Sequence, residues 1–178
     1  MRVSEPRGEG RQLQGSAYVD DDGSADPALE RALAAWGDSS ASYPRVLAAL
    51  AGARLLVPVV AVLGEVEYGE DGLARDKSSD MAAVLMTGSD GRTALLSFSS
   101  TATLTAWDPE ARPVPVATAL AAATAVQEGA AALVVDIAGP SPFVLEGDDL
   151  TRIAAGWQPV RLEDGTWGWL GAQSEEAP

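Results

Sequence analysis

Apolar residues near the start of the chain recur at the spacing of a helix. Leu29, Leu33 and Trp36 stand at i, i+4 and i+7, which places them on one face of a helix. Asp26 precedes this pattern as a capping residue, and Gly37 ends it. We expect an amphipathic helix that packs on a sheet and buries Trp36.

A second helix and a strand follow. The helix is predicted from Tyr43 to Ala51, with Ser42 as its cap and Gly52 as its end. The segment Leu55–Leu63 is apolar at odd and even positions alike, which is typical of a strand covered on both faces.

The middle of the chain predicts a hairpin and then a helix. Met81–Thr87 and Arg92–Phe98 are the two expected strands, joined by a glycine-containing turn. Ser99 or Ser100 then caps a short helix, whose Trp107 is expected to be buried.

The second half alternates extended and helical segments. Arg112–Val116 contains two prolines and is predicted to lie at a sheet edge. Thr118 is expected to cap an alanine-rich helix to Glu128, before the buried strand Leu133–Ile137 and a last helix near Asp148–Ala155. The pattern predicts an α/β (α+β) fold: one domain with a mixed β-sheet of about five strands, flanked by helices.

The two ends differ from this domain, which we place at residues 17–156. Residues 1–16 are polar and glycine-rich, and we expect them to be disordered. Residues 157–178 form an extension with a frayed end and a possible Asp164–Gly165 hairpin turn. This extension holds three of the five tryptophans, namely Trp157, Trp167 and Trp169.

The amino-acid composition excludes several kinds of catalytic and metal site. The chain has no histidine and no cysteine, the residues most used for proton transfer, nucleophiles and metal ligation. Its net charge of −14 repels phosphate backbones and anionic lipid. No apolar run reaches the roughly 18–20 residues of a membrane span, and no apolar stretch marks a secretory signal. We expect a cytoplasmic protein without cofactor that binds neither nucleic acid nor membrane.

The acidic segment Asp20–Asp26 offers oxygen ligands for a divalent cation. The EF-hand pattern fails, because aligning Gly23 with its glycine puts a tyrosine and a leucine at the first and twelfth ligand positions. The favoured interpretation is an acidic turn and helix cap, with no metal site. The rival hypothesis is a metal-dependent hydrolase that joins these carboxylates with Asp80 or Asp136.

A polar segment before the hairpin contains the only lysine. Its residues are Lys77, Ser78, Ser79 and Asp80. A serine and a lysine can act as nucleophile and base, but that chemistry needs a desolvated lysine, and Lys77 stands in a charged loop. A solvated loop is the leading interpretation, followed by a polar interaction patch.

Two further sets of residues are binding candidates. Ser99 and Ser100 stand at a helix start, where anions bind, although ordinary capping explains them as well. The three tryptophans of the extension suit either a recognition patch or packing on their own domain.

Several motifs stand in a characteristic order: Asp21–Pro27, Val57–Val59, Lys77–Met81, Gly91–Arg92, Ser97–Ser100, Leu104–Pro109, Arg112–Val116, Ala131–Asp136 and Gly139–Pro140. In this order they resemble the SseB family of the actinobacterial type, from about Tyr18 to Gly156. The resemblance implies a cytoplasmic α/β domain, named for enhanced serine sensitivity, with no established catalytic residues.

Our first hypothesis is a non-enzymatic module that binds a protein partner, a small ligand or a second copy. The Lys77–Asp80 loop and the tryptophans are its candidate surfaces. The hydrolase hypothesis requires the acidic side chains to converge in one pocket, and a structural or assembly subunit requires a stable oligomer.

Overall fold

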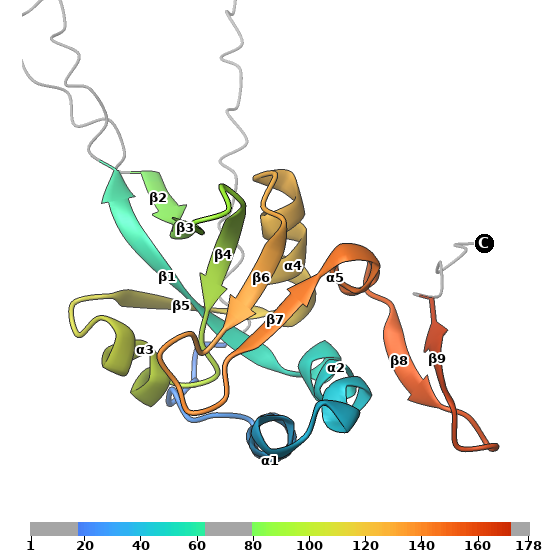
Figure 1. Ribbon diagram of the computed structural model, residues 1–178. Coiled ribbons are helices and arrows are strands. Elements are labelled where there is room, and N and C mark those ends of the chain that lie inside the picture. Colours follow the sequence, from blue (N-terminus) through green and yellow to red (C-terminus); the bar gives the residue numbers. More distant parts are fainter. Residues whose placement is uncertain (1–17, 63–79, 172–178) are drawn as a thin grey trace, which may run out of the picture.

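The computed structural model describes residues 18–62 and 80–171, and it confirms the predicted α/β fold (Figure 1). No helix in this part of the chain is long and apolar enough to cross a membrane. The helices are α1 (Pro27–Asp38), α2 (Tyr43–Gly52), α3 (Thr101–Trp107), α4 (Thr118–Gln127) and α5 (Gly147–Ala154), with a 3₁₀ turn at Ser40–Ser42. The strands are β1 (Arg54–Val62), β2 (Asp80–Ala83), β3 (Leu85–Thr87), β4 (Thr93–Ser97), β5 (Arg112–Ala117), β6 (Ala132–Val135), β7 (Phe143–Glu146), β8 (Gln158–Arg161) and β9 (Trp167–Leu170).

The described strands number nine instead of about five, and they form three sheets. Their orders are β2-β1-β5, β3-β4-β6-β7 and β8-β9. The four-stranded sheet is mixed, as expected, because β4 and β6 run parallel. All other neighbouring strands in the three sheets are antiparallel. Leu56 of β1 and Phe98 after β4 exchange two backbone hydrogen bonds of 2.8 Å, which join the first two sheets.

The expected single strand Met81–Thr87 is divided at Val84, and this prediction was wrong in its pairing. Its first half, β2, pairs with β1, and its second half, β3, pairs with β4. The Val84 N–H donates to the Pro58 carbonyl over 3.1 Å, but proline has no N–H to donate in return. The Leu96 N–H takes that place on the Val84 carbonyl, also at 3.1 Å, so the chain passes from one sheet to the next.

The four-stranded sheet separates two apolar clusters. One face carries Leu95, Leu133 and Leu145, which pack with residues of α1, α2, α4 and α5. The other face carries Leu96 and Val134, which pack with residues of α3. Side chains alternate along each strand, so Leu95 and Leu96, neighbours in the sequence, lie in different clusters.

Helix ends confirm one predicted cap and correct two others. The Asp26 carboxylate accepts two amide hydrogen bonds in the first turn of α1, as predicted. Ser42 does not cap α2, because its hydroxyl donates to the Ser39 carbonyl over 2.6 Å. Thr118 is the first residue of α4, and its hydroxyl donates to the Ala53 carbonyl over 3.0 Å. These two hydroxyls donate to backbone carbonyls instead of accepting from helix amides.

Trp36 and Trp107 are half-buried, whereas both were predicted to be buried. The Trp36 ring lies 5.9 Å from Tyr43 and 5.4 Å from Phe143 between centroids. The Trp107 ring lies 5.4 Å from Phe98. Each indole therefore covers the rim of a cluster whose centre is filled by phenylalanine and leucine side chains.

Candidate functional site

Ser99 and Asp136 meet where the two parallel strands end. Ser99 follows β4, and Asp136 follows β6. The Asp136 carboxylate accepts hydrogen bonds from the Ser99 N–H (2.8 Å) and the Ser99 hydroxyl (2.6 Å). Both residues are buried, with 4% exposure each. Ligands of open α/β sheets bind beyond the carboxyl ends of the strands, which is where Ser99 and Asp136 lie.

Asp136 has an unusual backbone conformation. Among the residues that the structure describes, Asp136 alone has a positive φ, of 54°, without being a glycine. Aspartate tolerates this conformation better than most residues. The Gly139 N–H donates to the Asp136 carbonyl over 2.8 Å. A Cβ on Gly139 would lie 3.1 Å from both that carbonyl oxygen and the Asp136 Cβ. The Gly139–Pro140 motif thus permits a tight turn that fixes the carboxylate beside Ser99.

Of the two candidate capping serines, Ser100 is the cap of α3. Its hydroxyl accepts from the Thr103 N–H over 3.2 Å, and the Ser100 N–H donates to the Thr103 hydroxyl over 3.3 Å. Ser99 is instead held by Asp136. Ordinary helix capping therefore explains Ser100 but not Ser99.

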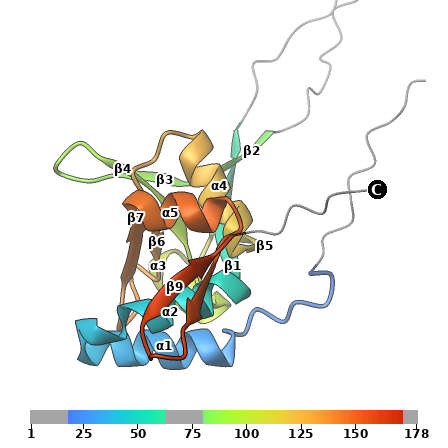
Figure 2. The same cartoon turned by 90° about the vertical axis from the view of Figure 1, so that its right-hand side faces the viewer.

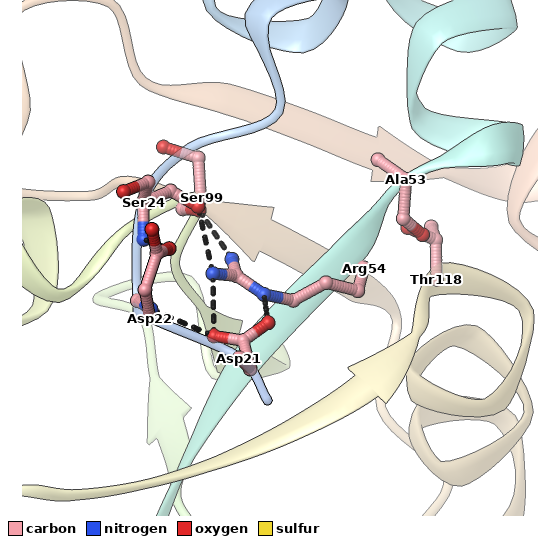
Figure 3. A network of polar contacts seen from close by, with 8 residues as sticks. Asp21, Asp22, Ser24, Ala53, Arg54, Ser99 and Thr118 are labelled. Atoms are coloured by element: carbon pink, nitrogen blue, oxygen red, sulfur yellow. Dashed lines mark hydrogen bonds and ion pairs between the residues drawn. The ribbon is translucent and has the colours of Figure 1, made fainter. Parts of the chain in front are cut away.

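Arg54, at the start of β1, connects Ser99 to the acidic N-terminal loop (Figure 3). Its guanidinium binds the Asp21 carboxylate through two hydrogen bonds and donates to the Ser99 carbonyl over 2.7 Å. It also donates to the Ser24 carbonyl over 2.7 Å. The hydrogen bond from Arg54 lowers the pKa of Asp21 below its ordinary value.

A cleft of about 440 Å³ opens beside Ser99 and Asp136. Carboxylates come from Glu30, Asp38 and Asp136, and no arginine or lysine is among the described residues that line it. Arg54 lies nearby, but its charge is compensated by Asp21. The full lining is Ala25, Glu30, Leu33, Ala34, Asp38, Ser99, Ser100, Thr103, Asp136, Pro140 and Ser141. The lining of the cleft is therefore acidic and rich in hydroxyls, with some apolar side chains.

The predicted acidic segment has structural contacts for three of its carboxylates. Asp21 binds Arg54, Asp22 accepts from the Ser24 N–H over 2.8 Å, and Asp26 caps α1. The Ser24 hydrogen bonds lower the pKa of Asp22. Among residues 18–62 and 80–171, no three aspartates or glutamates are grouped to hold a metal ion.

The polar loop remains a predicted surface. Lys77, Ser78 and Ser79 lie outside the described residues. Asp80 opens β2, where its backbone pairs with Val62 of β1.

The three tryptophans of the extension lie in and beside the β8–β9 hairpin. Trp169 packs against the larger apolar cluster, and the Arg152 guanidinium lies 5.4 Å from its ring centroid. Trp167 is half-buried, and Trp157 is exposed at 40%. The Asp164–Gly165 turn that was predicted joins the strands, with Gly165 at a φ of 83°.

Some site residues were missed from the sequence. Glu30, Ala34 and Asp38 form a row along α1 at i, i+4 and i+8, which could have indicated an acidic helix face. Arg54 is the charged residue directly before a long apolar run. A charge in this position is partly removed from water, so a carboxylate partner is expected for it. Ser141 gave no comparable signal.

Fold and cleft together define an α/β domain with an acidic site at the ends of its parallel strands. The chain belongs to the SseB family, since the family model for the SseB protein N-terminal domain matches residues 29–152. No curated protein and no solved structure matches the chain. The match includes every residue that lines the cleft except Ala25, and it ends before the β8–β9 hairpin.

Proposed function

We propose that this SseB-family protein is a non-enzymatic cytoplasmic interaction module whose cleft binds a lysine or arginine side chain of a protein partner. The observation that carries this proposal is the lining, in which the carboxylates of Glu30 and Asp38 are exposed, Asp136 is a third and buried carboxylate, and four residues carry hydroxyls, with no basic side chain among the described residues. A cationic group supplies the charge that such a site lacks, and its N–H groups match the acceptors around it.

The cleft also suits the aliphatic part of a basic side chain. Leu33, Ala34 and Pro140 contribute apolar side chains to the lining, and lysine and arginine pack their methylene groups on apolar surface. The net charge of −14 attracts a basic segment over longer distances. The same charge argues against nucleic acid and anionic membranes as partners.

The hydrolase alternative has weaker support: Asp20, Asp21, Asp22 and Asp26 do line one cleft, but Arg54 lines it as well and Asp136 lines a different one. It needs several free carboxylates around one metal ion. Asp21 and Asp26 instead bind an arginine and a helix N-terminus, and Asp136 holds Ser99. These contacts favour a binding site with fixed walls.

The proposal is tested by titrating ¹⁵N-labelled protein with N-acetyl-arginine amide, which carries the cationic side chain alone. N-acetyl-citrulline amide is the neutral control of nearly equal shape. We expect saturable amide shift changes around Ser99, Ser100 and Thr103 with the arginine compound and none with the citrulline compound. Equal responses to both compounds, or shifts confined to other surfaces, would contradict the proposal.

Variants make the test specific to charge. Glu30→Gln and Asp38→Asn each keep the shape of the side chain, and together they should weaken arginine binding about tenfold, as expected for the loss of charge-assisted hydrogen bonds. Glu110→Gln is the matched control, because Glu110 is exposed and does not line the cleft. The control variant should bind like the unchanged protein.

A further inference from the structure

The β8–β9 hairpin is a two-stranded sheet apart from the other two sheets. It lies in front of the domain in Figure 2, and in Figure 1 β8 is on the side of α2 while β9 is the outer strand. A two-stranded sheet leaves one edge of each strand without a ladder partner among the described residues.

The register shows which backbone groups occupy the free edge of β9. The Leu162 N–H donates to the Thr166 carbonyl over 2.8 Å, so this pair points its backbone groups into the hairpin. Antiparallel pairs alternate between inward and outward groups. Following the register along β9, the backbone N–H and carbonyl groups of Trp167 and Trp169 point away from β8.

The two edges of the hairpin differ in their chemistry. On β8 the corresponding outward residues are Pro159 and Arg161. Proline has no N–H to donate and arginine carries a charge, which are two common ways of protecting an edge strand. β9 reads Trp-Gly-Trp-Leu and has neither proline nor charge. Its edge is therefore open to another strand.

The surroundings of β9 are apolar as well. Leu162 and Leu170 are exposed at 48% and 54%, on the hairpin face opposite Trp167 and Trp169. A chain of net charge −14 repels its own copies over most of its surface. This uncharged strand is a place where two copies can approach without opposing carboxylates.

We propose that β9 pairs antiparallel with β9 of a second copy, so that two hairpins form a four-stranded sheet. A two-fold axis perpendicular to the sheet keeps equivalent faces together, so the tryptophans of both copies share one face and Leu170 lies on the other. The assembly closes at a dimer, because the remaining edge strand is β8 with Pro159. The contact is small, and it belongs to the class of weak, reversible interfaces.

Sedimentation velocity of the full chain tests this proposal. We expect the unchanged protein to shift from monomer to dimer between about 1 and 100 μM, the range of a weak interface. Trp167→Pro removes one outward N–H per copy but no hydrogen bond within the hairpin, and it should raise the dimer Kd about tenfold or more. Trp167→Val is the matched control, because it removes the same ring and keeps the N–H, and it should still form the dimer.

A second variant guards against loss of the hairpin itself. Leu170→Lys leaves the backbone unchanged and places a positive charge on β9 of both copies, as natural edge strands do, so it should also give monomers. Circular dichroism should show that Trp167→Pro melts as Trp167→Val does, and that Leu170→Lys melts as the monomeric unchanged protein does. A monomer at all concentrations for the unchanged chain, or a dimer that withstands Trp167→Pro and Leu170→Lys alike, would overturn the proposal.

Discussion

Replacing Arg54 with methionine tests whether the polar network beneath the cleft is needed for stability. The Arg54 side chain is 10% exposed, and that of its partner Asp21 is 14% exposed. The substitution keeps the aliphatic stem and removes every hydrogen bond of the guanidinium. Asp21 would keep its hydrogen bond from the Gly23 N–H at 2.8 Å.

The size of the effect follows from this burial. The pair is only partly buried, so the cost of removing Arg54 should lie nearer the value for hydrogen bonds to charged groups, about 1.5–3 kcal/mol, than the larger cost for a fully buried ion pair. The carbonyls of Ser99 and Ser24 lose charged donors as well. We expect Arg54→Met to lower the free energy of unfolding by about 1.5–3 kcal/mol.

Urea denaturation followed by circular dichroism measures this loss. The matched control is Arg45→Met, an exposed arginine on α2, which should change the free energy by less than about 0.5 kcal/mol. In a double-mutant cycle with Asp21→Asn, the two substitutions should cost less together than their sum. A loss below about 1 kcal/mol for Arg54→Met would refute the reasoning, since exposed pairs contribute that little.

The same variant has a pH signature. Arg54 lowers the pKa of Asp21 in the folded protein, so the folded state binds this proton less readily than the unfolded chain. The resulting stability is complete above the unfolded pKa of about 3.9 and is lost as the pH falls toward the folded value. Acidification from about pH 5 to pH 3 should therefore destabilise the unchanged protein more than Arg54→Met.

Two further predictions concern the tryptophans. Trp107→Ala should cost about 2 kcal/mol in urea denaturation, short of the roughly 3–5 kcal/mol of a fully buried ring, because the indole is half-buried against Phe98; a larger cost would mean that α3 depends on this ring. Trp169→Ala should cost about 1.5–2.5 kcal/mol at low protein concentration, because the ring packs on the larger apolar cluster and under Arg152. Unchanged stability would mean that the hairpin is not anchored to the domain.

The elements that depend on local sequence were predictable. The apolar spacing of α1 and its Asp26 cap need only neighbours along the chain. The same holds for the β8–β9 turn, where Gly165 takes a positive φ. The break at Val84 was not predictable in this way, because it depends on a proline in another strand that lies opposite it. Thr118 was misassigned for the same reason, since its hydroxyl binds a carbonyl 65 positions away.

The candidate site shows the same limit more strongly. Ser99 and Ser100 were selected for their place before a helix, and the structure separates them: one caps α3, and the other holds Asp136. Asp136 entered the prediction as part of an acidic cluster, yet its role depends on a positive φ that no apolar pattern indicates. The cleft exists because α1, the end of β4 and the end of β6 meet, and only the topology brings these segments together.

The contacts of Ser99 support the binding role proposed for the cleft, because they are formed without a ligand. The N–H and hydroxyl of Ser99 are held by Asp136, and its carbonyl accepts from Arg54, which is itself fixed by Asp21. The floor of the cleft thus has its polar groups in place before any ligand arrives, and binding costs little additional ordering there. A loosely held loop would have to lose conformational entropy on binding. The hydrogen bonds among Ser99, Asp136, Arg54 and Asp21 are therefore the feature of the structure that best supports the proposal of a preorganised binding site.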